Sequence, residues 1–387
     1  MPHDPQYLRH AGVANVVGLI GRGGARLAPE ALQDLDLLLR TTSGNVGNFA
    51  FWRGTRLLLG GDVRSMAARL PLSPEVRALV IPAANWLSAG SDFGWLADVV
   101  ESANLPTLLL GLGAQAGDDG QIPQLPAGTL RLLAAVEQRS PFMAVRGEFT
   151  RRVCAHYGIH RVRVLGCPSM FLNPDRQLGA RIAQRWSAPC RRLASHGFTE
   201  RGRATGAERV LFAMIAARDD AQFIVQAPRA LLGAVMPQVI LTAADQQALA
   251  AVAARIAPEL SVAEFHRCVQ QQGYLPTSID AWLAQLSGFS HTLNTRIHGT
   301  LMSLAAGVPG ICLTHDTRTL ELAATMRAPQ LAVESIAAHM SPEDLFACAG
   351  FDGAAFDHNR MQLARGYVEL LQAVGVTPAA AAIDLAA

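Results

Sequence analysis

The 387-residue chain contains no lysine, because all 33 of its Lys and Arg positions are arginine. Without lysine there can be no Schiff base to a carbonyl substrate, which excludes pyridoxal phosphate enzymes and lysine aldolases. The P-loop lysine of the usual ATPases and kinases is excluded for the same reason. Alanine is also very abundant, so we attribute the missing lysine to a bias in residue usage and keep only these exclusions.

Strong net charge is absent as well. The formal net charge is +2 and no concentrated basic stripe is visible, so nucleic acid is not expected as a partner. Half of the residues are apolar and 17% are charged, a composition that can fill two cores and leaves little room for a long disordered region. The length fits two domains of roughly 100–200 residues each.

Cysteine is scarce, and the six cysteines form no CxxC pair and no disulfide framework. Cys154 and His156 are two positions apart on an expected helix, so they point to different faces and do not make half of a zinc site. We therefore predict no metal. No apolar run is long enough to span a bilayer and no secretory signal is visible, which indicates a cytoplasmic protein.

Short apolar runs alternate with longer helical stretches, which is typical of parallel sheets covered by helices on both faces. The pattern restarts after residues 174–207, a segment rich in Arg, Ala and Gly in which we expect one helix and a polar linker. We predict an α/β protein with two doubly wound domains facing a cleft, at 1–190 and 205–355, followed by a C-terminal helix and tail at 356–387. The expected strands are Arg56–Gly60, Ala78–Pro82, Thr107–Gly111, Phe142–Val145, Arg161–Leu165, Arg209–Ile215, Phe223–Val225, Gln238–Leu241, Phe289–Leu293 and Pro309–Leu313.

Two glycine-rich turns are weak candidates for binding. The run 111–116 matches G-x-G-x-x-A, but glycine and proline residues follow where a helix would have to start, so we reject a nicotinamide site and expect a loop that places Gln115 in the cleft. The turn at 43–48 contains Asn45 and Asn48. Its backbone N–H groups could contact an anion, or the turn could be a plain connection, and the sequence favours neither.

The strongest candidate site lies around Arg296 and His298. A β run ends near Asn294 and a helix of small residues begins near His298, which places both side chains at the carboxyl end of a strand, where doubly wound folds bind ligands. A helix N-terminus suits a phosphate, Arg offers a fork for phosphate or carboxylate, and His carries protons near neutral pH. A salt bridge and a helix cap are the structural alternatives. The next strand ends at a second polar cluster, residues 314–318, which includes His315, Asp316 and Arg318 and favours function.

Several segments, in the same order along the chain, resemble the polysaccharide pyruvyl transferase family. These are PTLLLGLGAQ at 106–115, AVRG at 144–147, VLGCPS at 164–169, NTRIHG at 294–299 with AGVP at 306–309, and DTR at 316–318 followed by EL at 321–322. The RIHG element is the most specific. The resemblance covers about residues 40 to 325 and implies a GT-B-like pair of Rossmann-like domains, with the acceptor on the N-terminal side and the donor on the C-terminal side.

The resemblance also implies a reaction, in which a pyruvyl unit passes from phosphoenolpyruvate to two hydroxyls of a sugar, forming a ketal and releasing phosphate. It assigns His298 as the acid that protonates the methylene carbon, and it assigns donor binding to Arg296, Ile297, Gly299 and Arg146. Phosphoenolpyruvate is the donor substrate and no other cofactor is expected. The acceptor would be a sugar of a polysaccharide or a lipid-linked oligosaccharide, and a lipid-linked acceptor would bring the enzyme to the inner face of the membrane.

One departure from the family pattern is the turn at Gly47-Asn48, where relatives often carry Gly-Asp, and it concerns the acceptor side of the reaction. Two alternatives remain open at this stage. One is a GT-B glycosyltransferase that uses a nucleotide sugar, although only Glu321 is available as an acidic partner for the ribose. The other is a relative that binds a glycan or a phosphate compound without turnover. The oligomeric state is not indicated.

Overall fold

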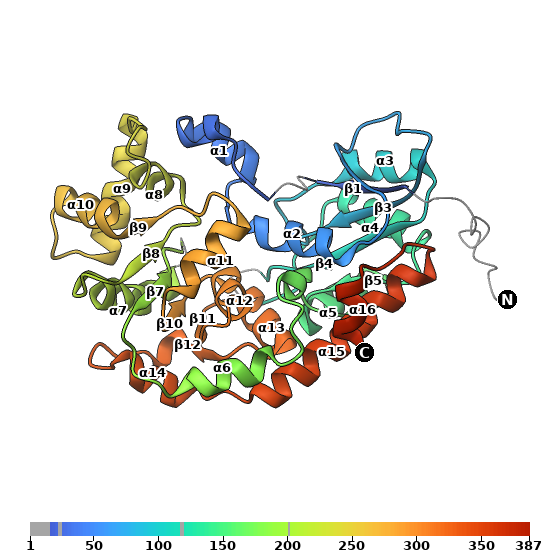
Figure 1. Cartoon of the computed structure of the whole chain (residues 1–387). Helices are drawn as coiled ribbons and strands as arrows, with labels where there is room; N and C mark the ends of the chain where they lie inside the picture. The colour runs from blue at the N-terminus through green and yellow to red at the C-terminus, as the bar shows by residue number, and fades with distance from the viewer. Residues whose placement is uncertain (1–15, 22–24, 117–119, 200–201) are drawn as a thin grey trace.

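The computed structural model describes residues 16–21, 25–116, 120–199 and 202–387. Within these residues the strands form two sheets of six parallel strands, ordered β2-β1-β3-β4-β5-β6 and β12-β11-β10-β7-β8-β9. Helices cover both faces of each sheet and the two halves lie side by side (Figure 1). The predicted fold class, two doubly wound α/β domains in a GT-B-like pair, is confirmed.

The N-terminal half carries the first sheet. Val76–Pro82 and Thr107–Leu112 lie at its centre because almost every side chain in them is apolar and buried on both faces, as parallel strands require. Its elements are β1 (Val16–Ile20), η2 (Pro29–Leu32), α1 (Leu35–Thr42), α2 (Asn48–Leu58), β2 (Val63–Met66), β3 (Val76–Pro82), α3 (Gly94–Ala103), β4 (Thr107–Leu112), α4 (Ala127–Glu137), β5 (Met143–Val145), α5 (Glu148–His156), β6 (Val162–Val164) and η3 (Pro168–Leu172).

The C-terminal half carries the second sheet, whose strand order reverses between β7 and β10. Such a reversal opens a crevice beyond the carboxyl ends of the two strands, which is where doubly wound folds bind ligands. Its elements are α6 (Leu178–Trp186), β7 (Leu193–His196), η4 (Gly202–Ala204), α7 (Thr205–Ala216), β8 (Gln222–Ile224), α8 (Arg229–Ala234), α9 (Ala243–Ile256), α10 (Val262–Gln272), β9 (Gly273–Tyr274), α11 (Ile279–Ser287), β10 (His291–Asn294), α12 (Ile297–Ala305), β11 (Gly310–Thr314), α13 (Thr317–Met326), β12 (Gln330–Ala332), η5 (Val333–Ser335), α14 (Pro342–Ala349), α15 (Gly353–Ala373) and α16 (Ala380–Ala386).

Segments from each end of the chain cross to the opposite half. Leu27 N donates to Thr277 O, and helix α1 contacts α8 of the C-terminal half. In return, the long helix α15 runs along both halves and leads to α16, whose start is tied to the end of α2 through the bridge between Leu59 and Pro378. These crossings tie the two halves together.

Three predicted strands are wrong. The runs at 56–60 and 209–215 belong largely to helices α2 and α7, because a short apolar run does not distinguish a buried strand from a buried helix. In α7 the buried positions Ala207, Leu211 and Ile215 recur every four residues, which is helical spacing. The run 238–241 lies between α8 and α9 and forms no strand.

Strand β7 (Leu193–His196) was missed because it lies in the segment expected to be a polar linker, and because two of its four residues are polar. It is nevertheless buried and sits at the centre of the second sheet.

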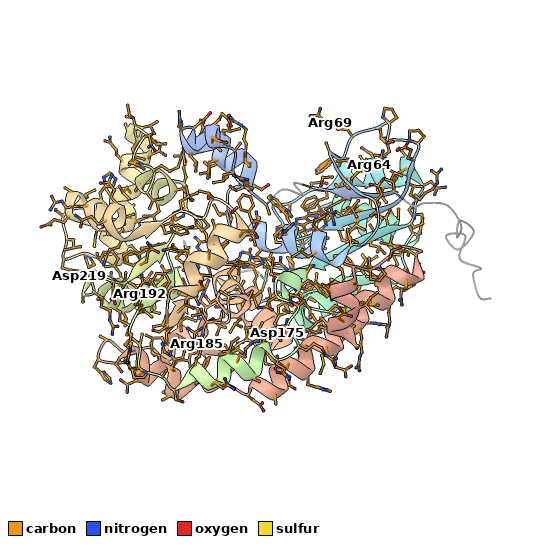
Figure 2. The ribbon with its side chains drawn as sticks, viewed as in Figure 1. Arg64, Arg69, Asp175, Arg185, Arg192 and Asp219 are labelled. Atoms are coloured by element: carbon orange, nitrogen blue, oxygen red, sulfur yellow. The ribbon has the colours of Figure 1, made fainter. Side chains whose placement is uncertain are left out.

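Charged side chains such as Arg64, Arg192 and Asp219 are exposed and point away from the body of the protein (Figure 2). Across the described ranges, no helix combines the length and the apolar composition needed to cross a membrane.

Candidate active site

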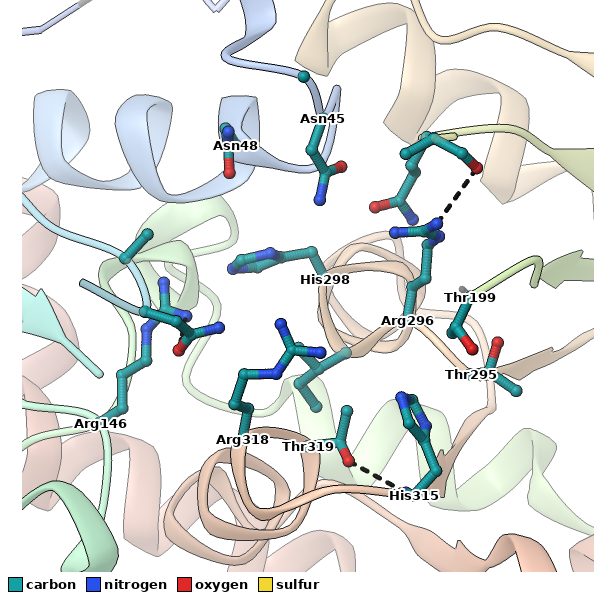
Figure 3. A pocket seen from close by; sticks show the side chains of 16 residues that line it. Asn45, Asn48, Arg146, Thr199, Thr295, Arg296, His298, His315, Arg318 and Thr319 are labelled. Atoms are coloured by element: carbon teal, nitrogen blue, oxygen red, sulfur yellow. Dashed lines mark hydrogen bonds between the residues drawn. The ribbon is translucent and has the colours of Figure 1, made fainter. Parts of the chain in front are cut away.

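A cavity of about 310 Å³ opens between the two halves. It lies beyond the carboxyl ends of β7, β8, β10 and β11 on one side and of β3 and β5 on the other, and the turn before α2 covers it (Figure 3). This is the crevice at the strand-order reversal. The lining residues are Gly44, Asn45, Asn48, Ala84, Asn85, Arg146, Thr199, Gln226, Ala227, Thr295, Arg296, Ile297, His298, His315, Arg318 and Thr319.

The lining is strongly cationic. Among the described residues that line the cavity are three arginines and two histidines, and none is an aspartate or a glutamate. Low-dielectric walls with charge of one sign concentrate ligands of the opposite sign. The cavity therefore suits an anionic ligand.

Arg146, which follows β5, is the most deeply buried of these cations, with 2% of its surface exposed. Its guanidinium donates to Gly111 O (2.9 Å) and Asn85 Oδ1 (3.0 Å), and it lies 5.7 Å from the ring centroid of Phe51. No carboxylate forms an ion pair with it among the described residues. Burial consequently lowers the pKa of Arg146, because nothing nearby fully compensates its charge. A buried cation in this state is stabilised by a bound anion.

Arg296 caps helix α12 and is held differently. Its Nε donates to Gly197 O (3.0 Å), and its Nη2 donates to Phe198 O (2.7 Å) and Ala227 O (3.2 Å). Three of the five N–H donors of this guanidinium are thus directed at backbone carbonyls of the loops after β7 and β8. Arg296 therefore fixes the shape of the cavity wall as well as lining it.

His298 lies one residue into α12 and points towards the N-terminal half, between Arg146 and Arg296 (Figure 3). Only 8% of its surface is exposed, and its Nε2 lies 3.8 Å from Cys167 Sγ. Burial lowers the pKa of His298 to about 3, and the positive charge of Arg146 adds to this shift. The imidazole is therefore neutral at pH 7 in the empty protein.

The N-terminus of α12 is itself a binding element. The amides of Gly299 and Thr300 donate to Arg296 O, whereas those of Ile297 and His298 have no partner within the described part of the chain. Free N–H groups and the positive end of the helix dipole favour an anion at this point.

The next strand end, after β11, adds His315 and Arg318. Arg318 donates from Nε (2.8 Å) and Nη2 (2.5 Å) to Asp316 Oδ2, which leaves the guanidinium pointing towards His298 (Figure 3). His315 is buried, with 5% of its surface exposed, and burial lowers its pKa. Two neighbouring strand ends of the second sheet thus each contribute one arginine and one histidine to the wall.

The turn before α2 and the loop after β8 contribute amides. Asn48 Nδ2 donates to Thr42 O (2.8 Å), and Asn45 Oδ1 accepts from Gly47 N (2.8 Å), so both side chains are fixed by local bonds. Gln226 is 1% exposed, and its Nε2 has no hydrogen-bond partner within the described residues. This side of the cavity offers neutral donors and acceptors of the kind that bind sugar hydroxyls.

A sequence profile of the polysaccharide pyruvyl transferase family matches residues 57–317 of the chain. The chain belongs to this family. No match was found among curated protein sequences.

Among solved structures, the chain is similar to the UDP-N-acetylglucosamine 2-epimerase from Rickettsia bellii, with 11% identity over 93% of this chain and 98% of that one and a TM-score of 0.38. It is also similar to the UDP-GlcNAc 2-epimerase from Neisseria meningitidis bound to UDP-GlcNAc, with 9% identity over 93% and 100% and a TM-score of 0.43. Likenesses this distant say nothing about function.

The glycines of the segments that resemble the family have packing roles. A Cβ on Gly299 would lie 2.4 Å from His196 Cβ, so only glycine lets α12 approach β7. A Cβ on Gly113 would lie 2.4 Å from Asn85 Oδ1 and 2.8 Å from Arg146 Cδ. The glycine loop after β4 therefore makes room for Arg146.

Three residues expected in the site do not line the cavity. Gly299 faces His196 in the core, and Gln115, whose backbone N–H donates to Leu87 O (3.0 Å), is not among the lining residues. Asp316 caps α13 and pairs with Arg318, so it orients a lining residue without being one. Glu321, the acidic residue considered as a ribose partner, is also absent from the lining. Its carboxylate accepts hydrogen bonds from Thr150 N (2.9 Å) and Thr150 Oγ1 (2.7 Å) of the N-terminal half.

The structure brings together seven of the expected residues: Asn45, Asn48, Arg146, Arg296, Ile297, His298 and Arg318. Sequence reasoning missed Asn85, Thr199, Gln226 and Thr319, and it noted His315 only as part of a polar cluster. Asn85 and Gln226 follow β3 and β8 by a few residues, so the rule that pointed to Arg296 could have found them. Thr199 follows the missed strand β7. The described residues contain no cluster of three or more His, Cys, Asp or Glu that could hold a metal.

Proposed function

We propose that this family member transfers the pyruvyl unit of phosphoenolpyruvate to two hydroxyls of a sugar, in a polysaccharide or its lipid-linked precursor, giving a ketal and phosphate. The observation that carries the proposal is the buried guanidinium of Arg146, which has no carboxylate partner among the described residues and faces a cavity shared with His298. Phosphoenolpyruvate carries a carboxylate and a phosphate close together, which matches a cavity with several separated cationic groups.

The donor would bind across the two halves. Arg146 would hold one anionic group from the N-terminal side, and the free amides of Ile297 and His298 together with Arg318 would hold the other from the C-terminal side. Bound in this way, the donor would have its enol carbon near His298. Arg296 would add charge and keep the loops that surround the donor in place.

The role of His298 as an acid depends on the donor. In the empty protein the pKa of His298 is about 3, because the ring is buried beside Arg146, so it carries no proton at pH 7. The negative charges of phosphoenolpyruvate would offset Arg146 and raise this pKa, so that binding the donor loads the ring with the proton that the methylene carbon needs. A histidine that is charged only when the donor is present would not protonate other molecules.

The acceptor would enter on the side of Asn45, Asn48 and Gln226, whose amides suit sugar hydroxyls. Exclusion of water from the cavity would protect the cationic carbon from hydrolysis. We expect the reaction in the cytoplasm, and at the inner face of the membrane if the acceptor is lipid-linked.

Calorimetric titration with phosphoenolpyruvate tests the donor, with UDP-GlcNAc as the competing ligand class. We expect saturable binding of phosphoenolpyruvate, accompanied by proton uptake that appears as a dependence of the heat on the ionisation enthalpy of the buffer. The His298→Asn variant should bind with less proton uptake, which separates this ring from the titration of the donor's own phosphate. Binding of UDP-GlcNAc without phosphoenolpyruvate binding would overturn the proposal in favour of a glycosyltransferase.

A further inference from the structure

If the first hydroxyl adds to the enol in one concerted step, two proton carriers act at the same moment. While the methylene carbon of phosphoenolpyruvate takes a proton, the attacking sugar hydroxyl has to lose one, so one carrier must be charged and the other neutral. A single histidine cannot be in both states during one step. If the proposed function holds, the cavity therefore needs a base in addition to His298.

Few side chains in the cavity can accept a proton near neutral pH. Arginine keeps its proton, and the amides and hydroxyls of Asn, Gln and Thr are not bases, so His298 and His315 are the candidates within the described lining. We infer that His315 is the base that removes the proton from the acceptor hydroxyl. This inference rests on the proposed function and adds a catalytic residue to it.

The environment of His315 fixes its protonation pattern. Its Nδ1 lies 3.3 Å from Leu313 O, and since a carbonyl oxygen only accepts, Nδ1 must carry the ring proton of the neutral imidazole. The lone pair is then on Nε2, and this atom is buried without a hydrogen-bond partner among the described residues. His315 lines the cavity, but Nε2 itself has almost no exposed surface, so the ring has to turn slightly before the hydroxyl donor that this acceptor lacks can reach it.

The charged groups around His315 come from three elements. On α13 and its cap, Asp316 Oδ2 lies 3.7 Å from Nε2 and would stabilise the imidazolium that forms, while Arg318 opposes it. Arg296 at the start of α12 also opposes it, and Glu334 of η5 is a further nearby negative charge. Burial is the largest influence and lowers the pKa of His315, which keeps the resting ring neutral, as a base must be.

With two histidines, every proton that moves in the reaction has a donor and an acceptor. In the first addition, C3 takes a proton from His298, C2 bonds to the first hydroxyl oxygen, and that hydroxyl gives its proton to His315 Nε2. When phosphate leaves, the electrons of its bond to C2 stay on the phosphate oxygen, which takes the proton from His315. The second hydroxyl oxygen then bonds to C2 and gives its proton to His298. One phosphoenolpyruvate and two hydroxyls yield one ketal and one hydrogen phosphate, and both rings return to their starting states.

The tautomer of His315 can be measured without knowing the acceptor. Long-range 1H–15N correlation spectra of 15N-labelled protein at pH 7, with phosphoenolpyruvate bound and with His315→Asn for assignment, should show a neutral ring protonated on Nδ1. A ring protonated on Nε2, or on both nitrogens, could not accept a proton from a hydroxyl at Nε2 and would overturn the inference.

Turnover gives the second test, as phosphate release from phosphoenolpyruvate with methyl glycosides of galactose, glucose and mannose. His315→Asn keeps a donor for Leu313 O but cannot take up a proton, so kcat/KM should fall at least about 10²-fold with phosphoenolpyruvate affinity unchanged. The low-pH limb of the kcat/KM profile should also disappear, because it reports protonation of the base. His160→Asn, on an exposed histidine outside the cavity, is the matched control.

The outcomes separate the two proposals. Failure of the unsubstituted protein to bind phosphoenolpyruvate would overturn the proposed function. Normal binding and turnover in His315→Asn, or loss of the high-pH limb in place of the low-pH limb, would overturn only the role of His315. If none of the hexosides is turned over, the tautomer measurement still decides.

Discussion

The two halves of the protein contain the same local arrangement, a strand followed by an arginine and a helix, but the two junctions present different side chains. In each, an arginine follows a buried strand within two residues and a helix begins within two residues after it, at Arg146 before α5 and at Arg296 before α12. Two positions further on, the N-terminal junction has the exposed Glu148, which pairs with Arg151, whereas the C-terminal junction has the buried His298. The first junction therefore delivers a cation to the cavity, and the second delivers a proton carrier and free helix amides.

The arginines themselves differ in what they hold. Each guanidinium directs three N–H donors at protein groups: Arg296 at three loop carbonyls, and Arg146 at Gly111 O, Asn85 Oδ1 and Ala83 O (3.5 Å). Arg146 is the more deeply buried of the two. From sequence, Arg296 is the stronger candidate because it belongs to the most specific motif. The structure buries Arg146 more deeply, and no carboxylate forms an ion pair with it among the described residues, so Arg146 is the better candidate for holding the donor.

Replacement of His298 should have the largest effect on this comparison. His298→Asn removes the proton carrier of the C-terminal junction and leaves Arg146 in place, so we expect turnover to fall at least about 10²-fold while phosphoenolpyruvate still binds. Single-turnover kinetics alongside calorimetry would separate the two quantities. Turnover at the unsubstituted rate would remove His298 from the mechanism.

Replacement of Arg146 should act on binding. Arg146→Gln keeps a polar side chain but removes the buried charge, and we expect the Kd for phosphoenolpyruvate to rise about 10- to 100-fold, as a charge-assisted hydrogen bond contributes about 1.5–3 kcal/mol. A Kd within twofold of the unsubstituted protein would show that the N-terminal junction does not hold the donor.

The matched variant Arg296→Gln tests whether the two arginines differ in their roles in donor binding and stability. Because it breaks bonds to Gly197 O, Phe198 O and Ala227 O, we expect it to lower the free energy of unfolding by about 2 kcal/mol and to raise the donor Kd less than Arg146→Gln does. Urea unfolding and calorimetry on the same preparations measure both effects. A larger loss of affinity than in Arg146→Gln, with unchanged stability, would reverse the assignment of roles.

The sequence predicted the C-terminal junction well because three signals coincide there: a β run, a helix start and reactive side chains between them. Apolar spacing also predicts helices at Asp92–Ala103, Glu148–Tyr157, Ala244–Ala254 and Ile279–Leu286, which match α3, α5, α9 and α11 with small errors at their ends. The sequence alone did not predict that Arg146 is buried. That burial depends on Gly111, Gly113 and Asn85, which the chain brings together only when β3, β4 and β5 pair.

Strand β7 shows a second limit of sequence reasoning. His196 lies in it and is fully buried, yet it is satisfied, because its Nδ1 bonds Asn294 Oδ1 (2.6 Å) and its Nε2 accepts from Trp282 Nε1 (3.0 Å). Both partners are about a hundred residues away along the chain. The sequence around such a polar residue resembles a linker, because the partners that allow it to be buried come from distant strands and helices.

The pH dependence of stability tests the burial of His298 itself. Its folded-state pKa of about 3 lies below the value of about 6.5 expected when the chain unfolds, so the unfolded state binds more protons between these limits and stability rises with pH there. In His298→Asn this contribution is lost, so the slope of unfolding free energy against pH should be shallower by about 1.4 kcal/mol per pH unit between pH 4 and 6.

Glu148→Gln at the other junction should leave the slope nearly unchanged, because the exposed pair of Glu148 and Arg151 contributes little. Urea unfolding followed by tryptophan fluorescence measures the slopes. Parallel slopes for His298→Asn and the unsubstituted protein would mean that this ring titrates normally in the empty cavity, and the acid role would then need no help from the donor.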